Sequence, residues 1–164
     1  MLFVAALNHY NAVLYEDEGR NAMHESIALF DEICNSKWFR RTEMILFLNK
    51  NDLFCDALRE GHSLRKCFHR EVGWNGQQWD ESNGNYDVVD YEKKDDIQKD
   101  NECFEFCYRQ SLDFVRDRYL ERNHNPLKMV FCHVTTATST TITEKVFWEV
   151  QNIIIRSNLK RKTL

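Results

Sequence analysis

The octamer at positions 45–52, Ile-Leu-Phe-Leu-Asn-Lys-Asn-Asp, constrains the fold of this chain more than any other stretch. A run of four apolar residues is typical of a strand that is buried on both faces, as in a parallel sheet. The run passes directly into a polar turn. Because ligands of open α/β sheets bind at the carboxyl ends of the strands, this turn is a candidate binding loop.

Other segments extend the same pattern. Short apolar runs predict strands at 2–7, 44–48 and 129–134. Apolar residues at helical spacing predict helices over about 18–35, 54–61 and 102–122. A capping box, Thr141-x-x-Glu144, predicts the start of a last helix that continues to about 160. Strands that alternate with helices imply an α/β fold in which three parallel strands are flanked by helices.

Residues 72–101 interrupt this pattern. Three glycines and many charged residues lie in this stretch, and aliphatic residues are few. Such a composition predicts a long exposed loop inserted into the domain. The chain of 164 residues is long enough for one domain with a core, and its net charge of −4 gives no field that favours nucleic acid.

The six cysteines predict no metal site. None forms a Cys-x-x-Cys pair, and Cys103 and Cys107, which could share a helix face, lack two further ligands at a suitable spacing. Free thiols in a reducing cytosol are the expected state. The chain has no run of 18 apolar residues, so no transmembrane helix is expected.

The turn after the second predicted strand carries groups suited to recognise guanine. Guanine presents N1–H and N2–H₂ as adjacent donors, and the Asp52 carboxylate can accept both. Adenine lacks this pair of donors and would leave the carboxylate unpaired. We expect Asn49 to donate to the N7/O6 edge and to brace the neighbouring loop, and the Lys50 stem to lie over the base; Asn51 is the variable position. The alternative is an ordinary turn, which Asn and Asp favour.

A second polar loop supports the guanine prediction. Thr135-Thr136-Ala137-Thr138 follows the third predicted strand directly. A tight turn there can offer the Ala137 backbone N–H to guanine O6, because a small side chain permits close approach. Both loops lie at the carboxyl ends of strands, where the ligand of an open sheet binds.

These features together resemble the alpha subunit of a heterotrimeric G protein. The resemblance covers about 1–71 and 102–160. It is specific, because small GTPases share the Asn-Lys-x-Asp loop but not the segments that flank it. Beyond the two loops it rests on seven segments: Phe3–Leu7, Leu14–Glu18, Asn21–Ser26, Leu29–Cys34, Lys37–Phe39, Phe131–Thr135 and Ile153–Leu159.

The resemblance implies part of a Ras-like P-loop GTPase domain that binds GTP or GDP. Family members carry a Gly-x-x-x-x-Gly-Lys-Ser phosphate loop, an arginine and a threonine in switch I, and Asp-x-x-Gly-Gln in switch II. None of these motifs occurs in the 164 residues, and neither do the ligands for the family's Mg²⁺. We therefore expect a truncated domain that contacts the base alone, has no catalytic residue and does not hydrolyse GTP by itself.

The resemblance also implies partners: a G-protein-coupled receptor, an effector and a beta-gamma dimer. It places receptor contacts in the last helix and tail, with Ile153, Asn158, Leu159 and Leu164 as candidates. It places an effector surface at 37–39, formed by Lys37, Trp38 and Phe39, although Trp38 and Phe39 could instead belong to the core. Family members work at the inner face of the plasma membrane, but this chain carries no lipidation signal. A receptor-binding decoy and an incomplete gene product are the competing interpretations.

Overall fold

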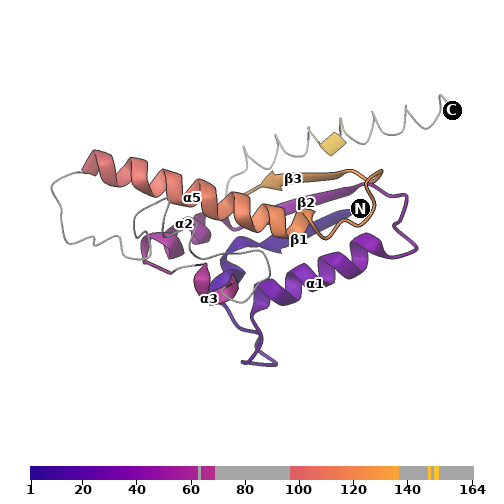
Figure 1. Cartoon of the computed structure of the whole chain (residues 1–164), viewed down its shortest axis with the longest axis horizontal. Helices are drawn as coiled ribbons and strands as arrows, with labels where there is room; N and C mark the ends of the chain where they lie inside the picture. The colour runs from indigo at the N-terminus through magenta and orange to yellow at the C-terminus, as the bar shows by residue number, and fades with distance from the viewer. Residues whose placement is uncertain (63, 69–96, 137–147, 149, 152–164) are drawn as a thin grey trace.

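The computed structural model describes residues 1–62, 64–68, 97–136, 148, 150 and 151 (Figure 1). The element order is β1 (Leu2–Ala6), a 3₁₀ helix η1 (Leu7–Asn11), α1 (Ala22–Asn35), β2 (Met44–Asn49), α2 (Asn51–Arg59), α3 (Arg65–Phe68), α5 (Ile97–Leu120) and β3 (Val130–Val134). The predicted last helix lies outside the described residues apart from Trp148, Val150 and Gln151, which are helical. None of the helices in these described ranges is long and apolar enough to cross a membrane.

The three strands form one parallel sheet in the order β1-β2-β3, which confirms the predicted fold class. Leu2 pairs with Ile45 and Leu46 with Cys132. The apolar runs form these strands because both faces of β2 are largely covered. Within the described sheet β1 is an edge strand, and its Leu2 and Val4 side chains are about half exposed.

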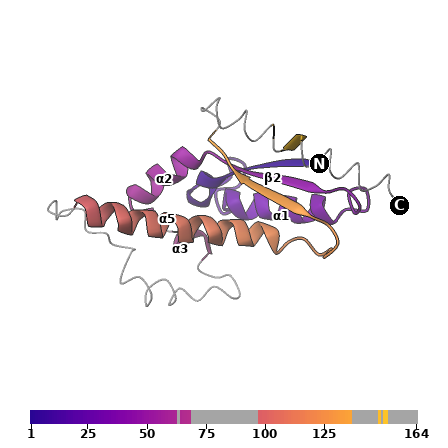
Figure 2. The same ribbon diagram turned by 90° about the horizontal axis from the view of Figure 1, so that it is seen from above.

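Helices α1 and α5 pack on one face of this sheet (Figure 2). Alternate strand residues point to the same face, so Phe3 and Leu46 share the core with side chains from both helices. The Phe3 and Phe30 rings meet edge to face with centroids 5.1 Å apart, and Phe30 meets Tyr119 in the same way at 5.6 Å. The Tyr119 hydroxyl donates to Ser26 Oγ at 2.8 Å. Burial raises the pKa of Tyr119 to about 12, so this hydroxyl keeps its proton.

Helix α1 begins at Ala22 rather than at the predicted Glu18. Asn21 is the N-cap: its side-chain oxygen accepts from the backbone N–H groups of Met23 at 2.8 Å and His24 at 3.3 Å. The chain before Asn21 forms a turn closed by a hydrogen bond from the Leu14 N–H to the Arg20 carbonyl. The capping asparagine therefore determines where the helix starts, although the preceding charged residues have helical propensity.

The other boundary predictions differ from the structure by a few residues. Leu7 belongs to η1 rather than to the strand before it, and α2 begins at Asn51 instead of Phe54. Helix α5 begins at Ile97, so residues 97–101 are helical and do not belong to the predicted 72–101 loop. These residues gave no helical signal in the sequence because four of the five are polar or charged.

Candidate functional site

The chain reverses from strand to helix through a single residue at the end of β2. Asn49 is the last residue of β2 and Asn51 is the first of α2. Lys50 between them has φ 60° and ψ 41°, the left-handed conformation, and it is the one non-glycine residue with positive φ in the described ranges. This conformation costs a side-chain-bearing residue about 1–2 kcal/mol. Such strain persists where surrounding contacts fix the backbone, commonly at functional sites.

Those contacts come from the loop after β3. The Thr135 N–H donates to the Leu48 carbonyl at 2.8 Å, and the Asn51 N–H donates to the Thr135 carbonyl at 3.2 Å. The Thr135 hydroxyl also donates to Asn49 Oδ1 at 3.2 Å. The two predicted guanine-reading loops are therefore joined side by side at one edge of the sheet. Because Asn49 Oδ1 serves as the acceptor, the Nδ2 group of Asn49 remains as a donor for a ligand.

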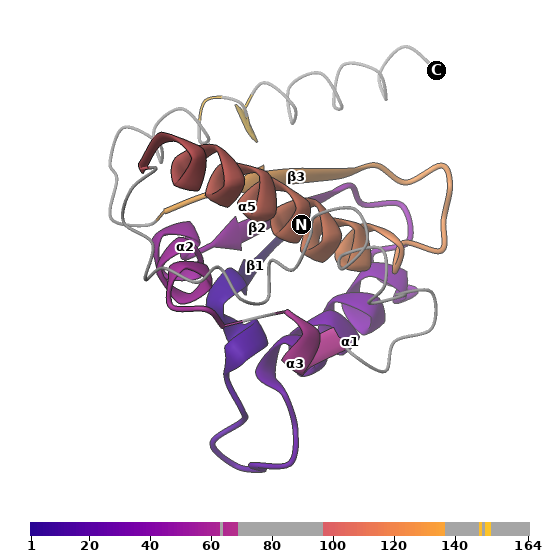
Figure 3. The same cartoon turned by 60° about the vertical axis from the view of Figure 1, so that its left-hand side comes forward.

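Lys50 and Asp52 are both exposed at this edge. Asp52 lies in the first turn of α2, where the positive end of the helix dipole favours a carboxylate. Figure 3 shows α2 just beyond the ends of β1 and β2. Two residues, the left-handed Lys50 and Asn51, separate the Asp52 carboxylate from the donor group of Asn49. Both polar groups therefore lie near the end of β2, where they are open to a ligand.

Asn51 is part of the loop, but its described contacts are with the protein. Its side-chain oxygen accepts from the Tyr108 hydroxyl of α5 at 3.0 Å. Burial raises the pKa of Tyr108, while the hydrogen bond to Asn51 lowers it, so the hydroxyl stays protonated as a donor. Sequence reasoning missed Tyr108 because it lies in a helix far along the chain from the loop that it anchors.

His9 is a third polar group at the same edge. It lies in η1, directly after β1, and its pKa is lowered by burial and by the nearby Lys50 charge. Its imidazole is therefore neutral over a wider pH range than an exposed histidine. The position of His9 just after an apolar strand is the signal that could have identified it from the sequence.

The remaining predicted residues lie apart from this edge or outside the described part. Thr136 is half-buried next to Thr135, while Ala137 and Thr138 lie outside the described residues. The receptor candidates Ile153, Asn158, Leu159 and Leu164 also lie outside them. Lys37, Trp38 and Phe39 lie at the opposite end of the sheet, between α1 and β2. Trp38 is 78% exposed, so the alternative that it belongs to the core is wrong, whereas Phe39 is half-buried.

The described part of the chain gathers no three His, Cys, Asp or Glu side chains that could hold a metal ion. No disulfide joins any two of the described cysteines, which are Cys34, Cys55, Cys67, Cys107 and Cys132. Burial raises the pKa of Cys132 to about 11, so its thiol stays protonated at neutral pH.

We expect Thr135→Val to lower the free energy of unfolding by about 1 kcal/mol, because it removes the hydroxyl that bonds Asn49 while keeping the side-chain shape. Thr135→Ser keeps the hydroxyl and is the matched control. Urea unfolding of both variants measures the difference. Equal losses in the two variants would show that the hydrogen bond between the loops contributes nothing to stability.

Comparisons with known proteins identify what the chain is similar to. The family model of the G-protein alpha subunit matches residues 1–154. A guanine nucleotide-binding protein alpha-2 subunit of Caenorhabditis briggsae is 35% identical over 164 residues, which is 100% of this chain and 37% of that protein. A guanine nucleotide-binding protein G(o) subunit alpha of Caenorhabditis elegans is 34% identical over 160 residues, which is 98% of this chain and 36% of that protein. The chain thus spans little more than a third of the length of these relatives.

Proposed function

This chain belongs to the family of G-protein alpha subunits, and on that premise we propose that its residues 1–164 read the guanine base of GDP or GTP in a GTP-dependent signal transducer. The observation that carries the proposal is the joined pair of loops at the carboxyl edge of the sheet, where the Thr135 hydroxyl bonds Asn49. The first residue of the second loop, Thr135, is thus held against the end of β2 before any ligand arrives. Such preorganisation reduces the conformational cost of binding.

In the proposed complex each polar group contacts a different part of guanine. The Asp52 carboxylate accepts from guanine N1–H and N2–H₂, a pair of charge-assisted hydrogen bonds that adenine cannot make. Asn49 Nδ2 donates to the N7/O6 edge, since Asn49 Oδ1 is already occupied by Thr135. The exposed Lys50 stem lies over the base. We propose that the Ala137 N–H completes the set by donating to guanine O6, with Thr136 and Thr138 supporting its loop.

We propose that Asn49, Lys50, Asp52 and Ala137 recognise the base and take no part in phosphate chemistry. GTP hydrolysis requires Mg²⁺, a phosphate-binding lysine, a positioned water and a charge-stabilising arginine. The 164 residues hold neither a Gly-x-x-x-x-Gly-Lys-Ser motif nor Asp-x-x-Gly-Gln. We infer that this stretch alone does not hydrolyse GTP, because the family's Mg²⁺ ligands belong to motifs that the 164 residues do not contain.

The partners proposed for the protein follow from family membership. They are a G-protein-coupled receptor, a beta-gamma dimer and an effector, met at the inner face of the plasma membrane. Trp38 is 78% exposed and is therefore accessible to an effector, as the proposed effector surface of Lys37, Trp38 and Phe39 requires.

Asp52→Asn tests the proposed base recognition. We expect the variant to bind GDP about 10- to 100-fold more weakly, because an amide loses the charge-assisted pair and turns a donor toward guanine N2–H₂. It should gain affinity for xanthosine diphosphate, whose C2 carbonyl accepts from that donor. Nucleotide titrations of the full chain followed by NMR measure both constants, with ADP as the competing base.

Asp56→Asn is the matched control, because Asp56 is an exposed carboxylate one turn further along α2. It should leave GDP binding unchanged. Equal affinity of the unmodified chain for GDP and ADP, or equal effects of the two substitutions, would overturn the proposed role of Asp52.

A further inference from the structure

The end of the sheet opposite the guanine-reading loops carries two adjoining hollows. Residues of the turn from α1 to β2 and of the turn from α5 to β3 line them. Both turns lie at the right of Figure 1. One has a volume of about 620 Å³ and is lined by Arg40, Arg41, Glu43, Asn125, Leu127 and Lys128. The other, of about 490 Å³, shares Arg40 and Asn125 and adds Lys37 and His124. We call Lys37, Arg40, Arg41 and Lys128 the basic edge.

The basic edge is positively charged, whereas the chain as a whole is negatively charged. The basic edge brings four cationic side chains to the two hollows, and Glu43 is the one carboxylate among the described residues that line them. Asp31 lies nearby, with its carboxylate 3.8 Å from His124 Nε2. The whole chain carries a net charge of −4, so this local excess of positive charge is not a consequence of composition. Such a site attracts an anionic ligand.

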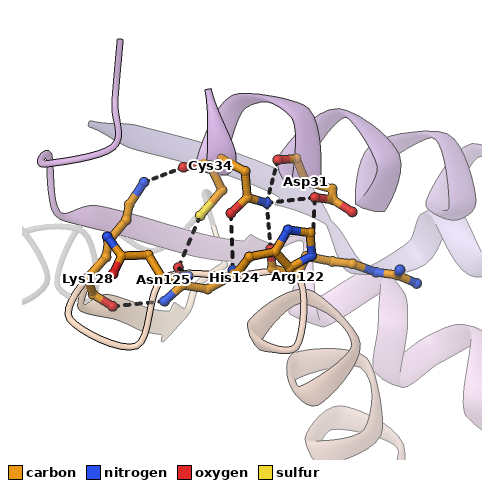
Figure 4. Close-up of polar contacts among 8 residues, drawn as sticks. Asp31, Cys34, Arg122, His124, Asn125 and Lys128 are labelled. Carbon is orange, nitrogen blue, oxygen red and sulfur yellow. Dashed lines mark hydrogen bonds and ion pairs between the residues drawn. The ribbon is translucent and has the colours of Figure 1, made fainter. Parts of the chain in front are cut away.

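Hydrogen bonds hold the hollows in shape, and Figure 4 shows those that join the end of α1 to the turn after α5. Lys128 is 6% exposed, and its Nζ donates to the Cys34 carbonyl at 2.6 Å and to the Phe39 carbonyl at 3.1 Å. Asn125 Nδ2 donates to the Arg40 carbonyl at 3.2 Å. An ammonium group carries three donors, so Lys128 keeps one beyond its two bonds to described residues. The backbone of Arg40 is therefore held in place before a ligand binds.

Apolar side chains stand beside the basic edge. Trp38 is 78% exposed, with Lys37 Nζ 5.0 Å from the centre of its ring. Leu127 is 92% exposed and Met129 is 54% exposed. Tryptophan and basic side chains are enriched together at membrane interfaces, where the aromatic ring lies at the level of the headgroups and cations meet the lipid phosphates. The combination distinguishes this surface from one that binds a soluble anion alone.

We propose that the basic edge binds the phosphorylated headgroup of an anionic lipid. Arg40 and Arg41 contact the phosphate, a role suited to guanidinium groups because they can donate two parallel hydrogen bonds to one phosphate. Lys128 also lines the larger hollow and adds its positive charge there. Trp38 and Leu127 enter the interfacial layer around the headgroup. Lipid binding here is independent of the proposed guanine binding, which we assign to the other end of the sheet.

The test compares the full chain with Arg40→Ala/Arg41→Ala in sedimentation with vesicles. The vesicles contain phosphatidylcholine alone, or phosphatidylcholine with a minor fraction of a phosphatidylinositol phosphate. A basic residue near an anionic surface contributes about fivefold to binding, so the double variant should lose roughly 25-fold on the anionic vesicles. Arg59→Ala/Arg109→Ala, an equal change of charge at exposed positions on α2 and α5, should bind as the unmodified chain does.

Two further measurements separate the sources of phosphate and the role of the apolar residues. Soluble inositol phosphate should compete for the vesicles, and Trp38→Ala should weaken vesicle binding while it leaves inositol phosphate binding intact. Equal binding of the two double variants, or equal binding to neutral and anionic vesicles, would overturn the proposal. Tight binding of inositol phosphate without any vesicle binding would overturn the lipid as the source. Circular dichroism of each variant confirms that a loss of binding is not a loss of fold.

Discussion

Phe30→Ala should lower the free energy of unfolding by about 3–5 kcal/mol. Phe30 is fully buried on α1, where its ring meets Phe3 of β1 and Tyr119 of α5 edge to face. The substitution removes apolar surface from the core and leaves a cavity bounded by three different elements, which cannot all move inward to fill it. Equilibrium urea unfolding followed by circular dichroism measures the loss.

Leu29→Ala provides the control on the same helix. Leu29 precedes Phe30, but it is 48% exposed, so its truncation should change stability by less than about 1 kcal/mol. Similar losses for Leu29→Ala and Phe30→Ala would mean that α1 does not pack through the face described here. A much smaller loss for Phe30→Ala than for an ordinary core truncation would mean that the aromatic cluster collapses into the cavity.

Lys128→Met should lower the free energy of unfolding by about 2–3 kcal/mol. The methionine keeps an apolar stem of similar length, but it cannot donate to the carbonyls of Cys34 and Phe39. Each buried carbonyl left without its donor costs about 1–3 kcal/mol. Cys34 also lies in the last turn of α1, where a cation is favoured by the helix dipole, so this end of the helix loses a second stabilising interaction. Urea unfolding measures the change.

Lys37→Met is the matched control, because Lys37 lines the neighbouring hollow but is exposed. Its removal should alter stability by no more than about 0.5 kcal/mol. If both lysine variants were equally stable, the two carbonyls would have found other donors and the buried ammonium would not hold the turns together.

The strands could be predicted from the sequence because burial on both faces leaves an unbroken apolar run. Their parallel order followed from the helices between them. The helix boundaries were harder to predict, because single residues determine them. Asn21 caps α1 after a charged stretch that itself favours helix, and Lys50 adopts a conformation that no propensity assigns to lysine.

The site was predictable only where its residues follow the strand ends. Asn49, Asp52 and Thr135 satisfy that condition, and the structure places Asn49 and Thr135 in contact. Tyr108 could not be predicted, because its bond to Asn51 joins residues 57 positions apart and depends on where α5 lies. The basic edge was missed for the same reason: its cations come from two turns separated by most of the chain.

Lys50, the left-handed residue at the end of β2, should reduce the backbone entropy that is lost when a ligand binds at this edge. A flexible binding loop loses about 1–2 kcal/mol of backbone entropy for each residue that a ligand orders. Here Lys50 separates a strand from a helix, and the neighbouring backbone is bonded to Thr135, so little freedom is left to lose. The ordering cost is met when the chain folds. The apparent affinity of the proposed site for guanine nucleotides should therefore follow the population of the folded sheet. Substitutions far from the ligand, in the core or at the opposite turns, should weaken this affinity in proportion to the unfolding that they cause, while the ratio of affinities for guanine and adenine stays unchanged.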